Sequence, residues 1–374
     1  MPARLSADHP HVATAADGNA LISQRIAEGE PFIAGRLGTN EICVLRANLT
    51  AVPRGLPRCS GGGFHGTSGI YPETPRMIHS FARTYEASVR SLRKRDVVGA
   101  FRLRAKKELP LFRSLAPAAR VVEAAALAPF LHASPWSAAL ENKTVAVVHP
   151  FGESIECQLR RRARLFRDQS VLPPSTTWKV VHMYQALGRC EPHGSWTETL
   201  EASKRRLDAA MPFDVAIIGA GSYGMPIAAH VRDRLRRSAV VMGGFTQTLF
   251  GIRGDRWEVK GIAAPRVRSS GAVVIPFDSH PAAPLAQVHR LTSEGGAAWM
   301  YPLRGDMPRG VVASTSRAQS TQGADYFAPS RAQSPARCPL DAQGGQPGGV
   351  AGDAGQDSAA AESQSGRAER DYSY

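Results

Sequence analysis

The segment Phe213-Asp-Val-Ala-Ile-Ile-Gly-Ala-Gly-Ser-Tyr-Gly-Met-Pro-Ile-Ala-Ala-His230 decides the fold, because an apolar strand runs into a glycine turn and then a helix. Val215 to Ile218 is a short run of β-branched and small apolar residues, typical of a buried parallel strand. The following G-x-G-x-x-G spacing lets backbone N–H groups and a helix N-terminus approach a diphosphate. The segment therefore predicts a nucleotide or nucleotide-sugar ligand. The candidate binding residues are Gly219, Gly221, Ser222, Tyr223 and Gly224.

A dinucleotide coenzyme usually requires an Asp or Glu about 20 residues further on, where the acid binds a ribose hydroxyl. The next predicted strand, Ala239-Val-Val-Met-Gly-Gly-Phe245, ends in glycines instead, and Asp255 lies beyond it. No arginine that could bind an NADP phosphate sits at that strand end, since Arg236 and Arg237 precede the strand. An NAD(P)-dependent oxidoreductase is therefore an alternative rather than the leading hypothesis, and a tight turn without any ligand also stays open.

Length and patterning favour one large α/β domain with appended segments. The chain has 374 residues, and strand and helix patterns alternate from about residue 21 to residue 258. This alternation predicts a Rossmann-like, mostly parallel sheet with helices on both faces. We expect a flexible N-terminus over 1–20, an irregular segment over 259–308 and a disordered tail over 309–374, where large apolar residues are scarce.

Periodicity and turn residues place the other elements of the domain. The predicted strands lie near 31–36, 97–101, 121–125, 144–149 and 178–182. The predicted helices lie near 21–28, 42–49, 75–95, 135–140, 155–166 and 196–210. The glycine-rich stretch 61–69 is predicted to be a flexible loop.

The formal net charge is +14, but the sequence does not favour a nucleic-acid partner. The basic residues cluster at 90–95, 102–107 and 160–167. In the last cluster, apolar residues recur at helical spacing, so the arginines form the solvated face of an amphipathic helix. No aromatic residues interleave with the basic ones, and no nucleic-acid motif is present. Peripheral association with an anionic membrane is compatible with this charge.

The cysteines give no recognisable pattern. Their number is odd, their spacing fits no zinc site, and we expect no disulfide framework. The N-terminus lacks the apolar core of a signal peptide, and no apolar run reaches about 18 residues. A cytoplasmic protein without a transmembrane segment is therefore expected. The five cysteines are Cys43, Cys59, Cys157, Cys190 and Cys338.

Ligands of parallel α/β sheets bind at the carboxyl ends of the strands, so polar residues at those places are candidates. A histidine in such a position is more often structural than catalytic. Arg36 and Glu41 sit in a glycine turn between a strand and a helix, where charges contribute little to a core. Both a functional and a structural role stay open for this pair. The other candidates are Asn40, His149, His182, Ser222, Tyr223 and Gln247.

Two blocks of the sequence resemble a known family. Phe32-Ile-Ala-Gly-Arg-Leu-Gly-Thr-Asn-Glu-Ile42 resembles the first block of GT-D glycosyltransferase domains, an Arg-Phe-Gly-Asp-Gly-Glu segment that contains an Asp-x-Glu motif. Their second block is similar to Ile217 to Gly224 with Val240 to Gly244. The resemblance covers about residues 21–258. Uncharacterised bacterial relatives associated with polysaccharide gene clusters carry segments similar to 135–137, 147–151, 213–218 and 249–257.

The resemblance implies a glycosyltransferase that uses a nucleotide-activated sugar in bacterial cell-surface polysaccharide synthesis. The acceptor would be a glycan or a lipid-linked molecule. The family's Arg falls on Arg36 and its Glu on Glu41, whereas its Asp falls on Thr39. A divalent cation, Mg or Mn, would therefore find a single carboxylate, that of Glu41, in this motif.

The roles that follow from the resemblance divide between binding and proton transfer. Arg36, Asn40 and Gly244 would bind the nucleotide sugar together with the glycine turn. Glu41 would take the metal, a ribose hydroxyl or the acceptor proton, and His149 is a second candidate for proton transfer. Because the resemblance stops after Glu258, a non-catalytic nucleotide-sugar-binding module is a third hypothesis. In that case the sugar side of the cleft would be incompletely covered, and transfer activity would be weak or absent.

Overall fold

The computed structural model describes residues 12–49, 59, 63–101, 105–187 and 189–252, together with two short strands further along the chain. These strands, β8 (Arg266–Val267) and β9 (Val273–Val274), pair antiparallel. The rest of the segment predicted to be irregular, 259–308, lies outside the described residues. The tail predicted to be disordered, 309–374, lies wholly outside them.

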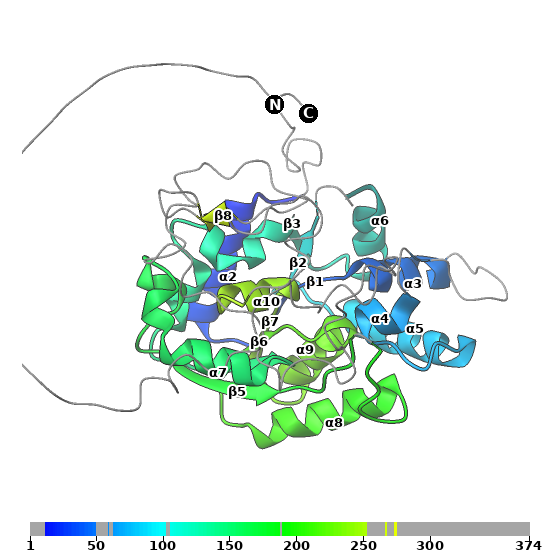
Figure 1. Cartoon of the computed structure of the whole chain (residues 1–374). Coiled ribbons are helices and arrows are strands. Elements are labelled where there is room, and N and C mark those ends of the chain that lie inside the picture. The colour runs from blue at the N-terminus through cyan, green and yellow to red at the C-terminus, as the bar shows by residue number, and fades with distance from the viewer. Residues whose placement is uncertain are drawn as a thin grey trace, which may run out of the picture.

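Seven parallel strands form the central sheet (Figure 1). Their order is β3-β2-β1-β7-β6-β4-β5, and each neighbouring pair is parallel. This arrangement confirms the predicted Rossmann-like α/β fold. The strands are β1 (Ile33–Arg36), β2 (Val97–Ala100), β3 (Arg120–Glu123), β4 (Thr144–His149), β5 (Thr177–His182), β6 (Val215–Ile218) and β7 (Ser238–Val241).

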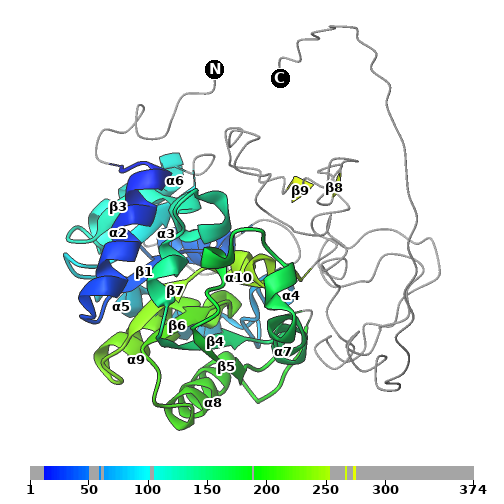
Figure 2. The same cartoon turned by 90° about the vertical axis from the view of Figure 1, so that its left-hand side faces the viewer.

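The helices cover both faces of the sheet (Figure 2). They are α2 (Ala15–Glu28), α3 (Thr39–Leu49), α4 (Gly63–Ser68), α5 (Pro75–Arg90), α6 (Ala105–Leu115), α7 (Gly152–Arg160), α8 (Trp196–Ala209), α9 (Gly224–Asp233) and α10 (Gly244–Leu249). Ala146 and Val148 of β4 pack with apolar residues of α3, α5, α6, α8 and α9. Val145 and Val147 pack with those of α2, α7 and α10. Burial on both faces explains why the strands are continuous apolar runs.

Helix α2 begins before the predicted start at residue 21. The Thr14 side chain accepts a hydrogen bond from the Asp17 N–H at 3.1 Å and so caps the helix. Ala13 forms a parallel bridge with Val122 in β3. The prediction of a flexible N-terminus over 1–20 is therefore wrong for its last residues, which belong to the α/β domain.

The stretch 61–69, predicted to be a flexible loop, contains helix α4. The Glu73 carboxylate accepts the His65 N–H at 2.6 Å, and the Thr67 hydroxyl donates to the Gly63 carbonyl at 2.8 Å. These bonds satisfy backbone groups at the ends of a short helix. A contact from outside the stretch thus overrides its glycine-rich composition.

Three predicted elements end earlier in the structure than the sequence patterns indicated. Helix α5 ends at Arg90 rather than near Arg95. The basic helix predicted over 155–166 is α7, which ends at Arg160 and is followed by a 3-10 turn at Arg162–Arg164. Strand β7 ends at Val241, so the glycine pair predicted to end the strand lies in the turn and at the start of α10.

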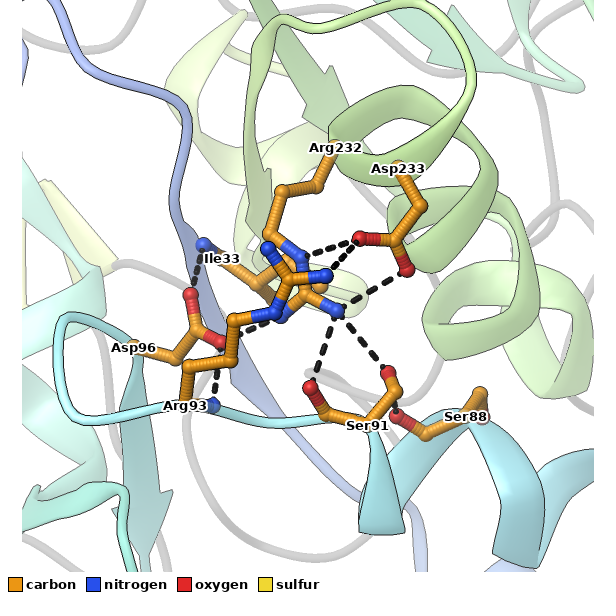
Figure 3. Close-up of polar contacts among 7 residues, drawn as sticks. All are labelled: Ile33, Ser88, Ser91, Arg93, Asp96, Arg232 and Asp233. Carbon is orange, nitrogen blue, oxygen red and sulfur yellow. Dashed lines mark hydrogen bonds and ion pairs between the residues drawn. The ribbon is translucent and has the colours of Figure 1, made fainter.

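A buried charge network connects the amino ends of β1 and β2, at the opposite ends of these strands from their carboxyl ends (Figure 3). The Asp96 carboxylate, just before β2, accepts the backbone N–H groups of Ile33 at 2.7 Å and Arg93 at 2.6 Å. It also pairs with the Arg232 guanidinium, which in turn donates to Ser91 and Asp233. Burial raises the pKa of Asp96, while the two N–H groups and Arg232 oppose this shift. The network ties β1, β2 and α9 together.

A disulfide joins Cys43 in α3 to Cys59, 16 residues further along the chain. The expectation of no disulfide is therefore wrong for this pair, which matched no known cysteine framework. Cys190 is free. Disulfides are typical of oxidising compartments, and the cytoplasmic location expected from the sequence stays a prediction.

Candidate functional site

The carboxyl ends of the central strands are the candidate site. Strand β4 leads into α7 on one face of the sheet, whereas its neighbour β6 leads into α9 on the other. Likewise, β1 leads into α3 and its neighbour β7 leads into α10 on opposite faces. Open α/β sheets bind their ligands where neighbouring connections diverge in this way. The two points of divergence, between β1 and β7 and between β6 and β4, lie close together, because β7 and β6 are neighbours in the sheet.

Arg36, the last residue of β1, lies across the carboxyl end of β7. Its Nε donates to the Met242 carbonyl at 2.9 Å. The rings of Phe101 and Phe245 lie 5.1 and 5.2 Å from the guanidinium carbon. At Gly243, which has φ of 58°, a Cβ atom would collide with the guanidinium. The chain thus holds the planar head group rigidly beside a backbone turn, which suits recognition of phosphate oxygens.

This placement corrects one step of the sequence reasoning. No arginine follows β7 in the sequence, yet the structure brings Arg36 to that strand end from the neighbouring strand β1. The predicted ligand residue Gly244 lies next to it, since a Cβ at Gly244 would be 3.9 Å from the Arg36 Nη2 atom. The absence of an arginine there therefore no longer counts against an NADP-type ligand.

Glu41 lies in the first turn of α3 with 4% of its surface exposed. Its carboxylate folds back over Gly38, where a Cβ atom would collide with it. Burial raises the pKa of Tyr85 well above its usual value, Glu41 adds to this shift and Arg36 opposes it. Arg36 and Glu41 thus have opposite electrostatic effects on the same buried phenol.

The residues of the Thr39–Glu41 turn do not fit a divalent cation. Glu41 is their one carboxylate, and it is turned toward Gly38. Mg²⁺ and Mn²⁺ prefer several oxygen ligands, usually including more than one carboxylate or a substrate phosphate. Among the described residues, no three His, Cys, Asp or Glu side chains form a group that could hold a metal ion.

Asn40, predicted to bind the nucleotide, faces α4 instead. Its amide nitrogen donates to the hydroxyls of Thr67 at 2.7 Å and Ser68 at 3.0 Å. Its exposed fraction is 5%. The side chain therefore connects α3 to α4 and has a structural role in this arrangement.

The glycine turn after β6 has the geometry that the spacing predicts. Gly221 is exposed and has φ of 53°, which favours glycine. Gly224 lies so close to β7 that a Cβ atom would be 2.8 Å from Val241. A Cβ at Gly219 would lie 2.5 Å from His149 and 2.7 Å from Thr246. The turn therefore needs all three glycines, one for backbone conformation and two for close packing.

The side chains within this turn point into the protein. The Ser222 hydroxyl accepts the indole N–H of Trp196 at 2.8 Å. The Tyr223 hydroxyl donates to the Gly69 carbonyl at 2.9 Å, and burial raises its pKa. Both predicted ligand residues thus stabilise the packing of α8 and the segment after α4. Neither side chain is therefore directed toward a ligand at the turn, and the Tyr223 N–H donates to the Ala220 carbonyl at 3.1 Å.

His149 ends β4 and is 5% exposed. Its Nδ1 accepts the Phe151 N–H at 2.9 Å, so the proton of the neutral ring resides on Nε2. Burial lowers the pKa of His149 to about 3. The ring is therefore neutral at ordinary pH and suited to donating a hydrogen bond through Nε2. This arrangement does not favour the predicted role in proton transfer.

The remaining strand-end candidates, His182 and Gln247, have partners within the chain. His182 pairs with Glu156 at 2.7 Å, on the outer strand β5. The Gln247 amide donates to the Ile252 carbonyl at 3.5 Å. Both contacts accord with structural roles.

Sequence reasoning missed Phe101, Phe245 and Thr246. The two phenylalanines flank Arg36 although they come from separate strand ends. Thr246 is fully buried beside Gly219. Phe245 and Thr246 directly follow the glycine pair after β7. Their place after a strand end was the one feature of the sequence that could have marked them as site residues.

No protein-family model matches the chain, and no curated protein or solved structure does so either. The resemblance to GT-D domains thus rests on the quoted segments alone. None of the helices that the structure describes is both long and apolar enough to cross a membrane.

Proposed function

We propose that this chain is a glycosyltransferase that binds a nucleotide-activated sugar at the carboxyl ends of β1, β7 and β6. The observation that carries the proposal is the rigid Arg36 guanidinium, held beside a glycine turn at the centre of a parallel sheet. Neighbouring strands are about 4.8 Å apart, so Arg36 and the β6 turn lie roughly 10 Å apart along the sheet edge. Both can therefore contact one extended nucleotide.

In this proposal the transfer breaks the bond between the anomeric carbon and the diphosphate, and a new bond to an acceptor hydroxyl oxygen forms. The diphosphate gains negative charge as it leaves, and Arg36 with the amides of the glycine turn stabilises that charge. The acceptor hydroxyl loses its proton to a base. Glu41 is the better candidate, because His149 already accepts a hydrogen bond on Nδ1 and carries its proton on Nε2. A cell-surface glycan or lipid-linked acceptor follows from the resemblance.

A second candidate is an NADP-dependent oxidoreductase. The specific observation in its favour is the position of Arg36 at the end of β7, the strand after the glycine turn. Dinucleotide enzymes hold the ribose at that place, and arginine accommodates an NADP phosphate there. The resemblance of residues 32–42 to GT-D domains favours the sugar nucleotide.

Thermal-shift screening of the full chain against UDP-, GDP- and CMP-sugars, NAD and NADP distinguishes these candidates. The proposal predicts stabilisation by at least one nucleotide sugar and not by NADP. Stabilisation by NADP alone contradicts it. Product formation with a glycan acceptor, lost in Glu41→Gln, then separates a transferase from a non-catalytic binding module.

A further inference from the structure

One hydroxyl at the carboxyl edge lacks the hydrogen bond that its position normally provides. Thr246 lies in α10 and is fully buried, yet its Oγ1 has no hydrogen-bond partner among the described residues. Thr248 on the same helix donates to the carbonyl four residues earlier, that of Gly244, at 3.3 Å. The corresponding carbonyl for Thr246 is that of Met242, which accepts from the Arg36 Nε instead.

A buried hydroxyl without a partner destabilises a protein, and native structures rarely keep one. Valine has nearly the same shape and would fill the same space without that cost. A threonine at this position therefore calls for a partner that the folded chain itself does not supply.

The surroundings of the hydroxyl indicate what kind of partner fits. Thr246 Oγ1 and His149 Cδ2 lie 2.7 and 2.5 Å from the point where a Gly219 side chain would begin. Gly219 opens the glycine turn, and Gly221, two residues further on, is exposed. The His149 ring offers an N–H at Nε2, next to Cδ2, because its Nδ1 is occupied by Phe151. Two neutral hydrogen-bond donors thus lie beside the turn.

We propose that the Thr246 hydroxyl, with the His149 Nε2–H beside it, binds an acceptor oxygen of the nucleotide ligand and so positions the diphosphate. This inference rests on the proposed function and adds two donors to Arg36 and the turn amides. A phosphoryl oxygen fits, because it accepts several hydrogen bonds at once and the nearby Arg36 neutralises its charge. Thr246 is a positioning residue here, since it donates to the diphosphate and not to the reacting carbon.

The test compares Thr246→Val, Thr246→Ser and the wild-type full chain in two measurements. Without ligand, Thr246→Val should melt at the wild-type temperature or above it, because it removes an unpartnered hydroxyl. With UDP and GDP as probes in calorimetry, it should bind about tenfold more weakly, whereas Thr246→Ser, which keeps the hydroxyl, should bind within about twofold of wild type. Thr248→Val, which removes a hydroxyl that has its partner, is the control and should lower the melting temperature but not the affinity.

The outcomes separate the two proposals. If Thr246→Val melts clearly below wild type, the hydroxyl has a partner within the chain and the inference fails. If the wild type binds a nucleoside diphosphate and Thr246→Val binds it equally well, the inference fails while the proposed function stands. If the wild type binds only a CMP-sugar, which has no diphosphate, the inference fails while the proposed function stands. If it binds none of the nucleotide sugars of the screen, the proposed function fails and the inference fails with it.

Discussion

The buried histidine at the end of β4 makes stability depend on pH in a calculable way. His149 is neutral in the folded protein because burial lowers its pKa from 6.5 to about 3. In the unfolded chain it gains a proton below about pH 6.5. The unfolded state then binds more protons than the folded state, so stability is complete above pH 6.5 and is lost as pH falls toward 3. The slope is about 1.4 kcal/mol per pH unit, which gives a loss of about 2 kcal/mol at pH 5.

The effect can be isolated with His149→Asn. The asparagine amide oxygen can accept the Phe151 N–H in place of Nδ1, but the side chain does not titrate. Urea unfolding of both full-length proteins at a series of pH values between about 7.5 and 5 measures the difference. Wild type should lose about 2 kcal/mol more than the variant over that range. Parallel stability curves for the two proteins would mean that His149 takes up a proton as readily in the folded protein as in the unfolded chain.

Three further predictions concern packing and crosslinks. Gly219→Ala should destabilise the fold by about 1–3 kcal/mol in urea unfolding, because its Cβ meets a strand-end ring and a helix. The control Gly194→Ala should be near neutral, because Gly194 is exposed and its Cβ would come no closer than 3.1 Å to the flexible Glu198 carboxylate. Cys43→Ser should cost about 3 kcal/mol, the scale for a loop of this length; equal stability of the wild type with and without reductant would show that the bond does not form. Arg232→Met should cost about 3–5 kcal/mol, because it leaves the buried Asp96 without its cation, and a smaller loss in the melting profile would mean that the backbone N–H groups suffice.

Local patterns in the sequence predicted the parts of the fold that depend on neighbours in the chain. The β6 strand, its glycine turn and α9 were predictable, because apolar periodicity and glycine spacing act over a few residues. The start of α2 was also readable from Thr14 and Asp17, although composition alone placed it too late. Helix α4 was missed, since a carboxylate from outside the glycine-rich stretch stabilises it.

The site itself depends on the order of the strands in the sheet. The apolar periodicity of the sequence does not predict that order. Arg36 reaches the end of β7 only because β1 and β7 are neighbours in the sheet, although about 200 residues separate them in sequence. The same applies to Thr246 and His149, which meet across Gly219. Ser222 looked like a ligand residue from its spacing, but a tryptophan in α8 occupies its hydroxyl.

Calorimetry with the best sugar nucleotide from the screen measures whether Arg36 binds the diphosphate of a nucleotide sugar. Arg36→Met removes the guanidinium, and Arg46→Met is the control, because it removes the same charge from an exposed position in α3. We expect Arg36→Met to bind about 10- to 100-fold more weakly than wild type, the scale of a charge-assisted hydrogen bond of about 1.5–3 kcal/mol. The affinity of Arg46→Met should be unchanged. Equal affinity of wild type and Arg36→Met, with both proteins folded, would contradict it.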